Sequence, residues 1–262
     1  MQTTVQMLRT FLLAGRPARA TIALGLLLIL GLAQSGLAQT SNPLNFSKNY
    51  ILSGGDYVVG GVGLRGLGDA TGFATGRISI PDTVQAAATG KTSPGVPDGA
   101  NIVAAFLYWE TVEKSMSAFT GQKGFFGPIN SDLSVSSHPI TGTVLGNGNA
   151  PPSWSSGGCA GSSNGSTTLR TYRADVRPFI PLDANGNIVA NGTYQVSLAD
   201  SGSNGGGAPL TLGATLVFIY RVLGAGPLNA IILYDGAFSP SNQTLNSTMT
   251  QPMQGFYQPS SD

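Results

Sequence analysis

Residues 101–110 read NIVAAFLYWE and form the most apolar stretch of the chain body. Residues 215–221 (TLVFIYR) and 230–234 (AIILY) have the same character. Each run is short and rich in β-branched and aromatic residues, with glycine or proline near its ends, which favours a strand over a helix. Because polar residues do not alternate with apolar ones, we expect these strands to be covered on both faces.

A different pattern marks residues 192–198, which read GTYQVSL. Side chains alternate between the two faces of a strand, so Tyr194, Val196 and Leu198 would share one face and the intervening polar residues the other. The pattern predicts a half-buried strand with one wet face.

Weaker strand signals occur at residues 56–63, 76–80, 124–129, 138–145, 168–174 and 249–257. The total is about ten strands, and no long helical pattern separates them. Only residues 175–180 favour a helical turn, which Pro178 would limit. We therefore predict an all-β antiparallel two-sheet sandwich of jelly-roll or Greek-key type. It would span residues 54–257, between a linker at 39–53 and a tail at 258–262.

Composition supports this class. The 262 residues include 37 glycines and 16 prolines, and the 13 Lys+Arg nearly balance the 12 Asp+Glu. Charged residues make up 10%, against about 25% in an ordinary domain. A helical bundle is disfavoured because helix formers are scarce, and a nucleic-acid partner is excluded because no polycationic surface exists. The 41% hydrophobic content provides material for a core.

The N-terminus predicts export. Arg9, Arg16 and Arg19 precede an uninterrupted apolar run at residues 21–32, and small residues precede a cleavage site after Ala38. This is the layout of a secretory signal peptide, here a signal helix at residues 1–38. The general secretion route would place the protein outside the cell or on its surface. An uncleaved N-terminal anchor is the alternative, and it would be the protein's only contact with a membrane.

Two short motifs match patterns found in enzymes, and neither has the neighbouring structure that its chemistry requires. Residues 61–66 match G-x-G-x-x-G, but two further glycines follow where a dinucleotide site needs a helix. Residues 161–165 match G-x-S-x-G inside a glycine- and serine-rich loop, where composition alone produces such matches. The only histidine, His138, precedes a proline, and nothing in the sequence pairs it with a serine. We expect no enzymatic activity.

One candidate metal site is present. Asp183, Asn185 and Asn187 resemble a calcium loop in outline, with Asp200 as a further ligand. The spacing fails the EF-hand pattern, and Asn185-Gly186 is first of all a tight-turn signal. One cysteine, Cys159, and one histidine cannot form a closed zinc site. Calcium is thus the only cofactor that the sequence suggests, and whether Cys159 is free or paired between chains stays open.

Three aromatic residues are candidate contact residues. Trp154 is the only large apolar residue in the polar loop at residues 146–168, where it either pins the loop or projects toward a partner. Tyr108 and Trp109 could stack on sugar rings, although their apolar strand also fits core positions.

Four segments, at residues 99–109, 172–176, 191–196 and 212–220, together with Asp235-Gly236, carry a resemblance. In this order they resemble an exported bacterial domain found at the head of long surface or adhesin-like proteins. The resemblance covers residues 54–257 and implies a β-sandwich without an agreed active site. It also implies that relatives continue with further strands after residues 249–257, so this chain would be a short version with an open edge near its end.

These observations predict a non-catalytic, exported surface or extracellular interaction module. Its partner would be an extracellular protein or glycan, contacted through the loops at residues 146–168 and 183–191. The alternative is a carbohydrate-binding jelly-roll module with calcium assistance. Neither pattern nor composition determines the oligomeric state.

Overall fold

The computed structural model describes residues 44–81, 94–114, 118–150, 168–202, 208–224, 226–237 and 251–255. The predicted signal segment with Ala38, the contact residue Trp154, Cys159 and the tail lie outside the described residues.

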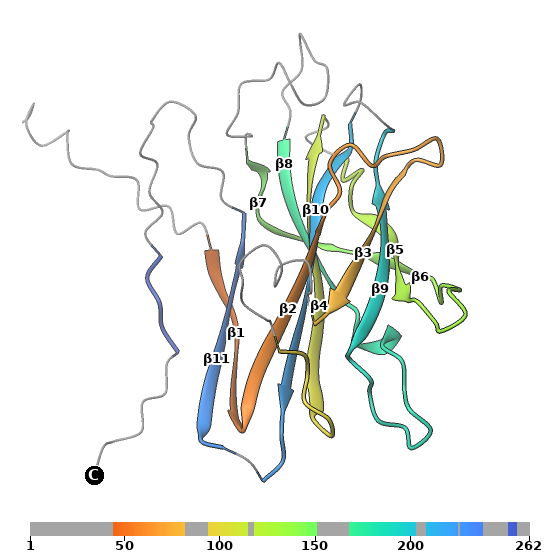
Figure 1. Cartoon of the computed structure of the whole chain (residues 1–262). Coiled ribbons are helices and arrows are strands. Elements are labelled where there is room, and N and C mark those ends of the chain that lie inside the picture. The colour runs from red at the N-terminus through yellow and green to blue at the C-terminus, as the bar shows by residue number, and fades with distance from the viewer. Residues whose placement is uncertain are drawn as a thin grey trace, which may run out of the picture. The chain divides into compact units, whose positions relative to one another are not determined.

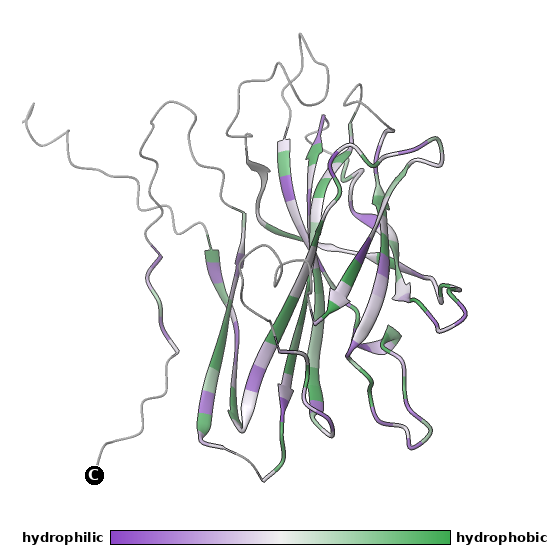
Figure 2. Cartoon of the chain, viewed as in Figure 1, coloured by the Kyte–Doolittle hydropathy of each residue, from purple (hydrophilic) through white to green (hydrophobic). Residues whose placement is uncertain are grey.

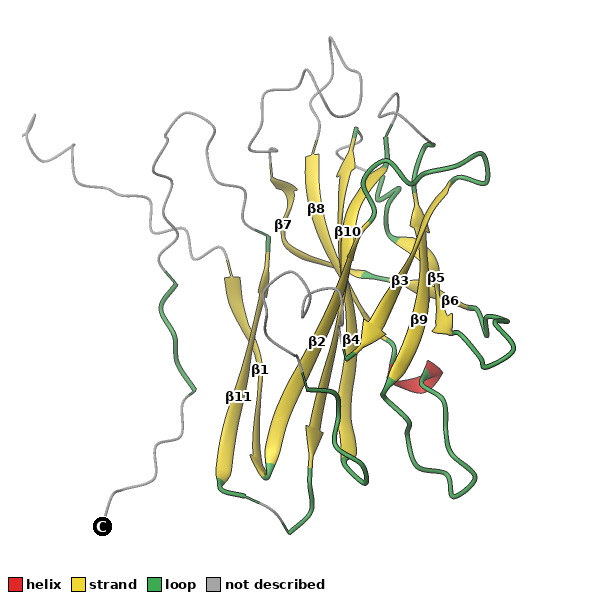
Figure 3. Ribbon diagram, in the orientation of Figure 1, coloured by secondary structure: helices red, strands yellow, loops and turns green. Residues whose placement is uncertain are grey.

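Within the described residues the protein is all-β, as predicted, and every strand pairing is antiparallel (Figure 3). The strands are β1 (Leu44–Ser53), β2 (Gly55–Gly63), β3 (Phe73–Ile80), β4 (Asn101–Glu113), β5 (Lys123–Pro128), β6 (His138–Thr141), β7 (Thr143–Ala150), β8 (Thr168–Asp175), β9 (Gly192–Ala199), β10 (Leu210–Arg221) and β11 (Leu228–Gly236). The predicted helical turn is a short 3₁₀ helix, η1 (Arg177–Phe179).

The strands form three sheets (Figure 1). One has five strands in the order β2-β10-β4-β8-β7, and another has four in the order β3-β9-β5-β6. The third is a two-stranded ribbon of β1 and β11. Five pairings are nested in sequence: β1 with β11, β2 with β10, β3 with β9, β4 with β8, and β5 with β6. Distant parts of the chain therefore meet throughout the fold.

The five- and four-stranded sheets contribute to one buried cluster. Leu107 and Phe218 reach it from the first sheet, and Tyr194, Val196 and Leu198 reach it from the second. These last three confirm the predicted alternation of β9, whose intervening residues are half-buried. Figure 2 shows apolar residues along the strands, as burial of one continuous core requires.

The β1–β11 ribbon explains why β4 and β10 are apolar on both faces. Ala104 and Ile219 point away from the main core and form a second buried cluster with Tyr50 of β1. Ile231 and Leu233 of β11 pack against this cluster and are only partly buried. The expectation that the strand at residues 230–234 is covered on both faces is met only in part, because all five residues are half-buried and none is fully buried.

Two further expectations need correction. Residues 44–53, predicted as linker, form β1, which is held by its pairing with β11 although most of its side chains are exposed. Residues 251–255, within a predicted strand, form no strand; instead the Tyr234 hydroxyl hydrogen-bonds the backbone N–H and C=O of Gln254.

The predicted strand at residues 138–145 is divided at Gly142 into β6 and β7. A Cβ at Gly142 would lie 2.5 Å from the Trp109 ring, so only glycine lets the backbone pass this close. The break thus follows from a tertiary contact.

Candidate functional site

Trp109 lies in the core with 2% of its surface exposed. Its indole N–H donates to the Gly121 carbonyl at 2.8 Å, and its ring stacks on Tyr172 at 5.5 Å between centroids. A ligand cannot reach this ring, so the prediction that Trp109 is a contact residue is wrong. The apolar strand that suggested an aromatic platform is instead the central strand of the core.

Tyr108 points to the opposite face of β4 and is half-buried. Its hydroxyl donates to Asp235 Oδ1 at 2.9 Å, and Arg173 forms an ion pair with the other oxygen of the same carboxylate. Burial raises the pKa of Tyr108. These bonds use Tyr108 to hold the ribbon on the larger sheet, which does not favour a sugar platform.

The structure separates the predicted metal ligands. Asp183, Asn185 and Asn187 share one turn before β9, whereas Asp200 directly follows β9. An eight-residue strand separates the two places by about 26 Å. Asp200 is buried and accepts hydrogen bonds from the backbone N–H groups of Gly202 and Thr211 at 3.0 and 2.8 Å. A calcium site that includes Asp200 is therefore ruled out by geometry.

Asp183 organises its own turn. Its carboxylate accepts the backbone N–H groups of Asn185 and Asn187 at 2.9 and 2.8 Å, and the Asn187 side-chain amide at 3.1 Å. The hydrogen bonds from Asn187 are the main reason why the pKa of Asp183 is lowered. The described ranges contain no group of three or more His, Cys, Asp or Glu side chains that could hold a metal ion.

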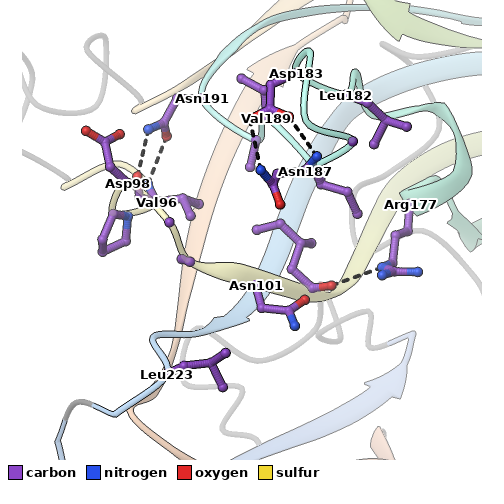
Figure 4. A pocket seen from close by; sticks show the side chains of 17 residues that line it. Val96, Asp98, Asn101, Arg177, Leu182, Asp183, Asn187, Val189, Asn191 and Leu223 are labelled. Carbon is purple, nitrogen blue, oxygen red and sulfur yellow. Dashed lines mark hydrogen bonds between the residues drawn. The ribbon is translucent and has the colours of Figure 1, made fainter.

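The Asp183 turn forms one wall of a pocket of about 780 Å³ (Figure 4). A second wall is the turn before β4 and the start of that strand, residues 96–102. Arg177 of η1 and Leu223, which follows β10, complete the lining. A volume in this range fits a small ligand or a few residues of a peptide.

Asn191 holds the two walls together. Its amide nitrogen donates to the Val96 carbonyl at 2.7 Å, and its side-chain oxygen accepts the Val96 N–H at 2.8 Å. The amide thus pairs with the backbone as a neighbouring strand would. This clamp fixes the turn before β4 against the start of β9 (Figure 4).

Arg177 is positioned from both sides. The Asp175 carboxylate accepts its backbone N–H at 3.0 Å, and its Nε–H donates to the Ile102 carbonyl at 3.0 Å. The two terminal nitrogens of the exposed guanidinium have no hydrogen-bond partner among the described residues. Asp98 lies across the pocket in Figure 4 and likewise has no partner within the described part of the chain.

Aliphatic side chains surround these charges. Leu182 is 62% exposed, Leu223 is 67% exposed, and Val189 is also exposed. None of the described residues that line the pocket is aromatic. The pocket therefore combines one anchored cation, the carboxylates of Asp98 and Asp183, and an exposed aliphatic rim.

A second cluster of charged groups lies at the far end of β4. Glu113 and Arg170 are fully buried and form an ion pair at 2.5 Å, while Tyr172 and Thr111 donate to the other oxygen of Glu113 at 2.5 and 2.8 Å. Burial alone would raise the pKa of Glu113, but these hydrogen bonds and the Arg170 charge lower it. Arg170 also donates to the Ala118 carbonyl. The cluster fixes the segment after β4 and is not open to a ligand.

Sequence reasoning found the Asp183 wall but missed Asp98, Arg177 and Leu223. Residues 97–99 read PDG, a turn signal, and residues 175–180 suggested a helical turn. Both signals predict local shape, and neither indicates that the two turns meet.

Comparisons of the chain with protein-family models, curated proteins and solved structures found no match. No helix in the described ranges is long and apolar enough to span a membrane.

Proposed function

We propose that the protein is an exported, non-catalytic interaction module that binds an extracellular partner in the pocket of Figure 4. The observation that carries the proposal is Arg177. An exposed guanidinium is anchored to the Ile102 carbonyl while its terminal nitrogens face no described protein group. Around it lie aliphatic side chains exposed well beyond what a core needs, which is typical of contact surfaces.

The scaffold we propose is a jelly-roll sandwich. The nested pairings from β2·β10 inward to β5·β6 support it, because a long antiparallel ribbon folded over itself forms two facing sheets in this way. The shared core of the two larger sheets also supports it. Such a scaffold presents loops at its ends, where binding residues are commonly found.

Export and surface location rest on the sequence. The pattern at residues 1–38 is that of a secretory signal, and the resemblance to adhesin-like proteins supports a role outside the cell. The absence of catalysis is proposed from the carboxylates. Glu113 is committed to a buried ion pair, and Glu110 lies three residues away in the same strand, so the two carboxylates do not converge.

A screen of the purified protein against a glycan array and a peptide library, each with and without Ca²⁺, tests this proposal. The variant Leu182→Glu, Leu223→Glu should abolish binding, whereas Leu67→Glu, which alters another exposed leucine outside the pocket lining, should not. Binding that survives the first variant would remove the pocket as the contact site. Turnover of a bound polysaccharide would contradict the non-catalytic assignment.

A carbohydrate-binding module is the second candidate. The pocket lining includes the side chains of Asp98, Asn101 and Asn187, which can hydrogen-bond sugar hydroxyls. Calcium would have to compete with the three hydrogen bonds that the Asp183 carboxylate already accepts. The glycan arm of the same screen separates this candidate from a protein-binding module.

A further inference from the structure

We propose that the partner of this pocket is a protein segment that carries one carboxylate beside aliphatic side chains. This inference rests on the proposed function, because it assumes that the pocket is the contact site. It names the chemistry that the pocket selects.

The carboxylate follows from the geometry of Arg177. The bond from Nε to the Ile102 carbonyl fixes the plane of the guanidinium and leaves its terminal N–H groups for a ligand. A fixed guanidinium fork matches the two oxygens of a carboxylate, and such charge-assisted pairs are among the strongest hydrogen bonds. Asn101, next to Ile102 and exposed at the start of β4, offers an amide donor in the same pocket.

The pocket's own carboxylates limit the ligand to one acid beside Arg177. Asp98, across the pocket from Arg177 (Figure 4), is exposed and has no partner among the described residues. A second carboxylate would meet a like charge, whereas a backbone N–H, an amide or a basic side chain would be accepted. The Asp183 carboxylate, held in its own turn on the other wall, adds further negative charge to the pocket. The pocket thus distinguishes the two ends of a bound segment.

The aliphatic part follows from Leu182, Leu223 and Val189. Covering their exposed surface with another apolar group removes it from water, which favours binding. Sugar rings are usually bound by the flat faces of aromatic side chains, and none lies among the described lining residues. Leucine, isoleucine or valine side chains of a peptide fit branched aliphatic neighbours better. These contacts favour a peptide over a glycan.

A phage-displayed library of random heptapeptides, panned on the purified full chain, tests the inference. We expect the selected peptides to share Asp or Glu next to Leu, Ile or Val. Arg177→Gln should weaken them roughly tenfold to hundredfold, which is the range for losing a hydrogen bond to a charged group. The peptide affinity of Arg177→Lys should lie between those of the wild type and Arg177→Gln, because lysine keeps the charge but lacks the planar guanidinium fork. Leu182→Ser, Leu223→Ser should also weaken binding.

The matched control is Arg65→Gln, which removes the same charge from an exposed loop between β2 and β3, outside the pocket lining. It should leave peptide affinity unchanged, and circular dichroism should show all variants folded. Selected peptides without an acid, or equal binding by Arg177→Gln, would overturn the inference. The inference would also be overturned if no peptide were enriched on the wild-type protein relative to the Arg177→Gln protein.

The glycan array keeps the two proposals apart. One outcome is that the protein binds glycans, that the double variant Leu182→Ser, Leu223→Ser abolishes this binding, and that no peptide is selected. This outcome would overturn the peptide partner and support the pocket as an interaction site. If neither the glycan array nor the peptide library gave binding, both proposals would be overturned.

Discussion

Arg173 in β8 and Asp235 in β11 form an ion pair that joins two separate sheets. Tyr108, which lies opposite Arg173 in the β4–β8 pairing, donates to the same carboxylate at 2.9 Å. Arg173 also reaches the Ser47 hydroxyl of β1 at 2.9 Å. One carboxylate therefore connects the ribbon to the outer face of the five-stranded sheet.

Asp235→Asn should loosen the ribbon. The change removes the charge that pairs with Arg173, and we expect the free energy of unfolding to fall by about 1–3 kcal/mol. Hydrogen exchange should become faster in β1 and β11 before it does in β4 or β10. The control is Asp56→Asn, which alters an exposed carboxylate whose hydrogen bond among the described residues comes from the neighbouring Tyr57 N–H. Identical urea midpoints and exchange rates for Asp235→Asn and the wild type would refute this role.

Glu113 should make stability depend on pH. Its pKa is lowered in the folded state from an ordinary value of 4.5, so it stabilises the fold above about pH 4.5. That contribution is lost as the pH falls through the lowered pKa. Urea midpoints measured across this acidic range should fall more steeply for the wild type than for Glu113→Gln. Parallel curves would show that Glu113 does not carry this dependence.

Glu113→Gln should also be costly at neutral pH. It leaves the buried Arg170 guanidinium without its charged partner, and breaking such a pair costs about 3–5 kcal/mol. Replacing both partners by apolar residues, as in Glu113→Leu, Arg170→Met, should recover part of this loss. Urea unfolding at pH 7 measures the free energy of unfolding of the single and the double variant. A double variant less stable than Glu113→Gln would contradict this account.

Gly142→Ala tests the close approach to Trp109. The added Cβ would lie 2.5 Å from the indole ring, and overpacking of this kind costs about 1–3 kcal/mol. Gly63→Ala in β2 places its Cβ in open space and should change stability by much less. Thermal unfolding compares the two. Equal melting temperatures would mean that the chain passes Trp109 at a greater distance.

Asn191→Ala should open the clamp between the pocket walls. It removes both bonds to the Val96 backbone, so we expect a loss of about 1–2 kcal/mol and faster exchange at residues 94–100. Asn185→Ala serves as the control because the Asp183 turn uses only the backbone N–H of Asn185. Unchanged exchange at residues 94–100 in Asn191→Ala would show that the clamp does not hold this wall.

The all-β class and most of the strands can be predicted from residue patterns alone. Alternation in β9 and continuous apolar runs in β4 and β10 report burial directly, because side chains of a strand point alternately to its two faces. The sequence also identified the turn at Asp183, since turn chemistry is local. The strand β1 was not predicted because its side chains are mostly exposed and its stability comes from pairing with β11, far along the chain.

Which of the predicted residues come together depends on the three-dimensional fold. Asp183 and Asp200 suit one site on sequence grounds, but the full length of β9 separates them. Trp109 and Tyr108 are neighbours whose side chains face opposite sides of β4, one toward the core and the other toward Asp235. Arg177 meets the turn at Asp98 because the nested pairing brings distant loops to one end of the strands. Local sequence patterns report which face of a strand is buried, whereas these meetings depend on long-range pairing.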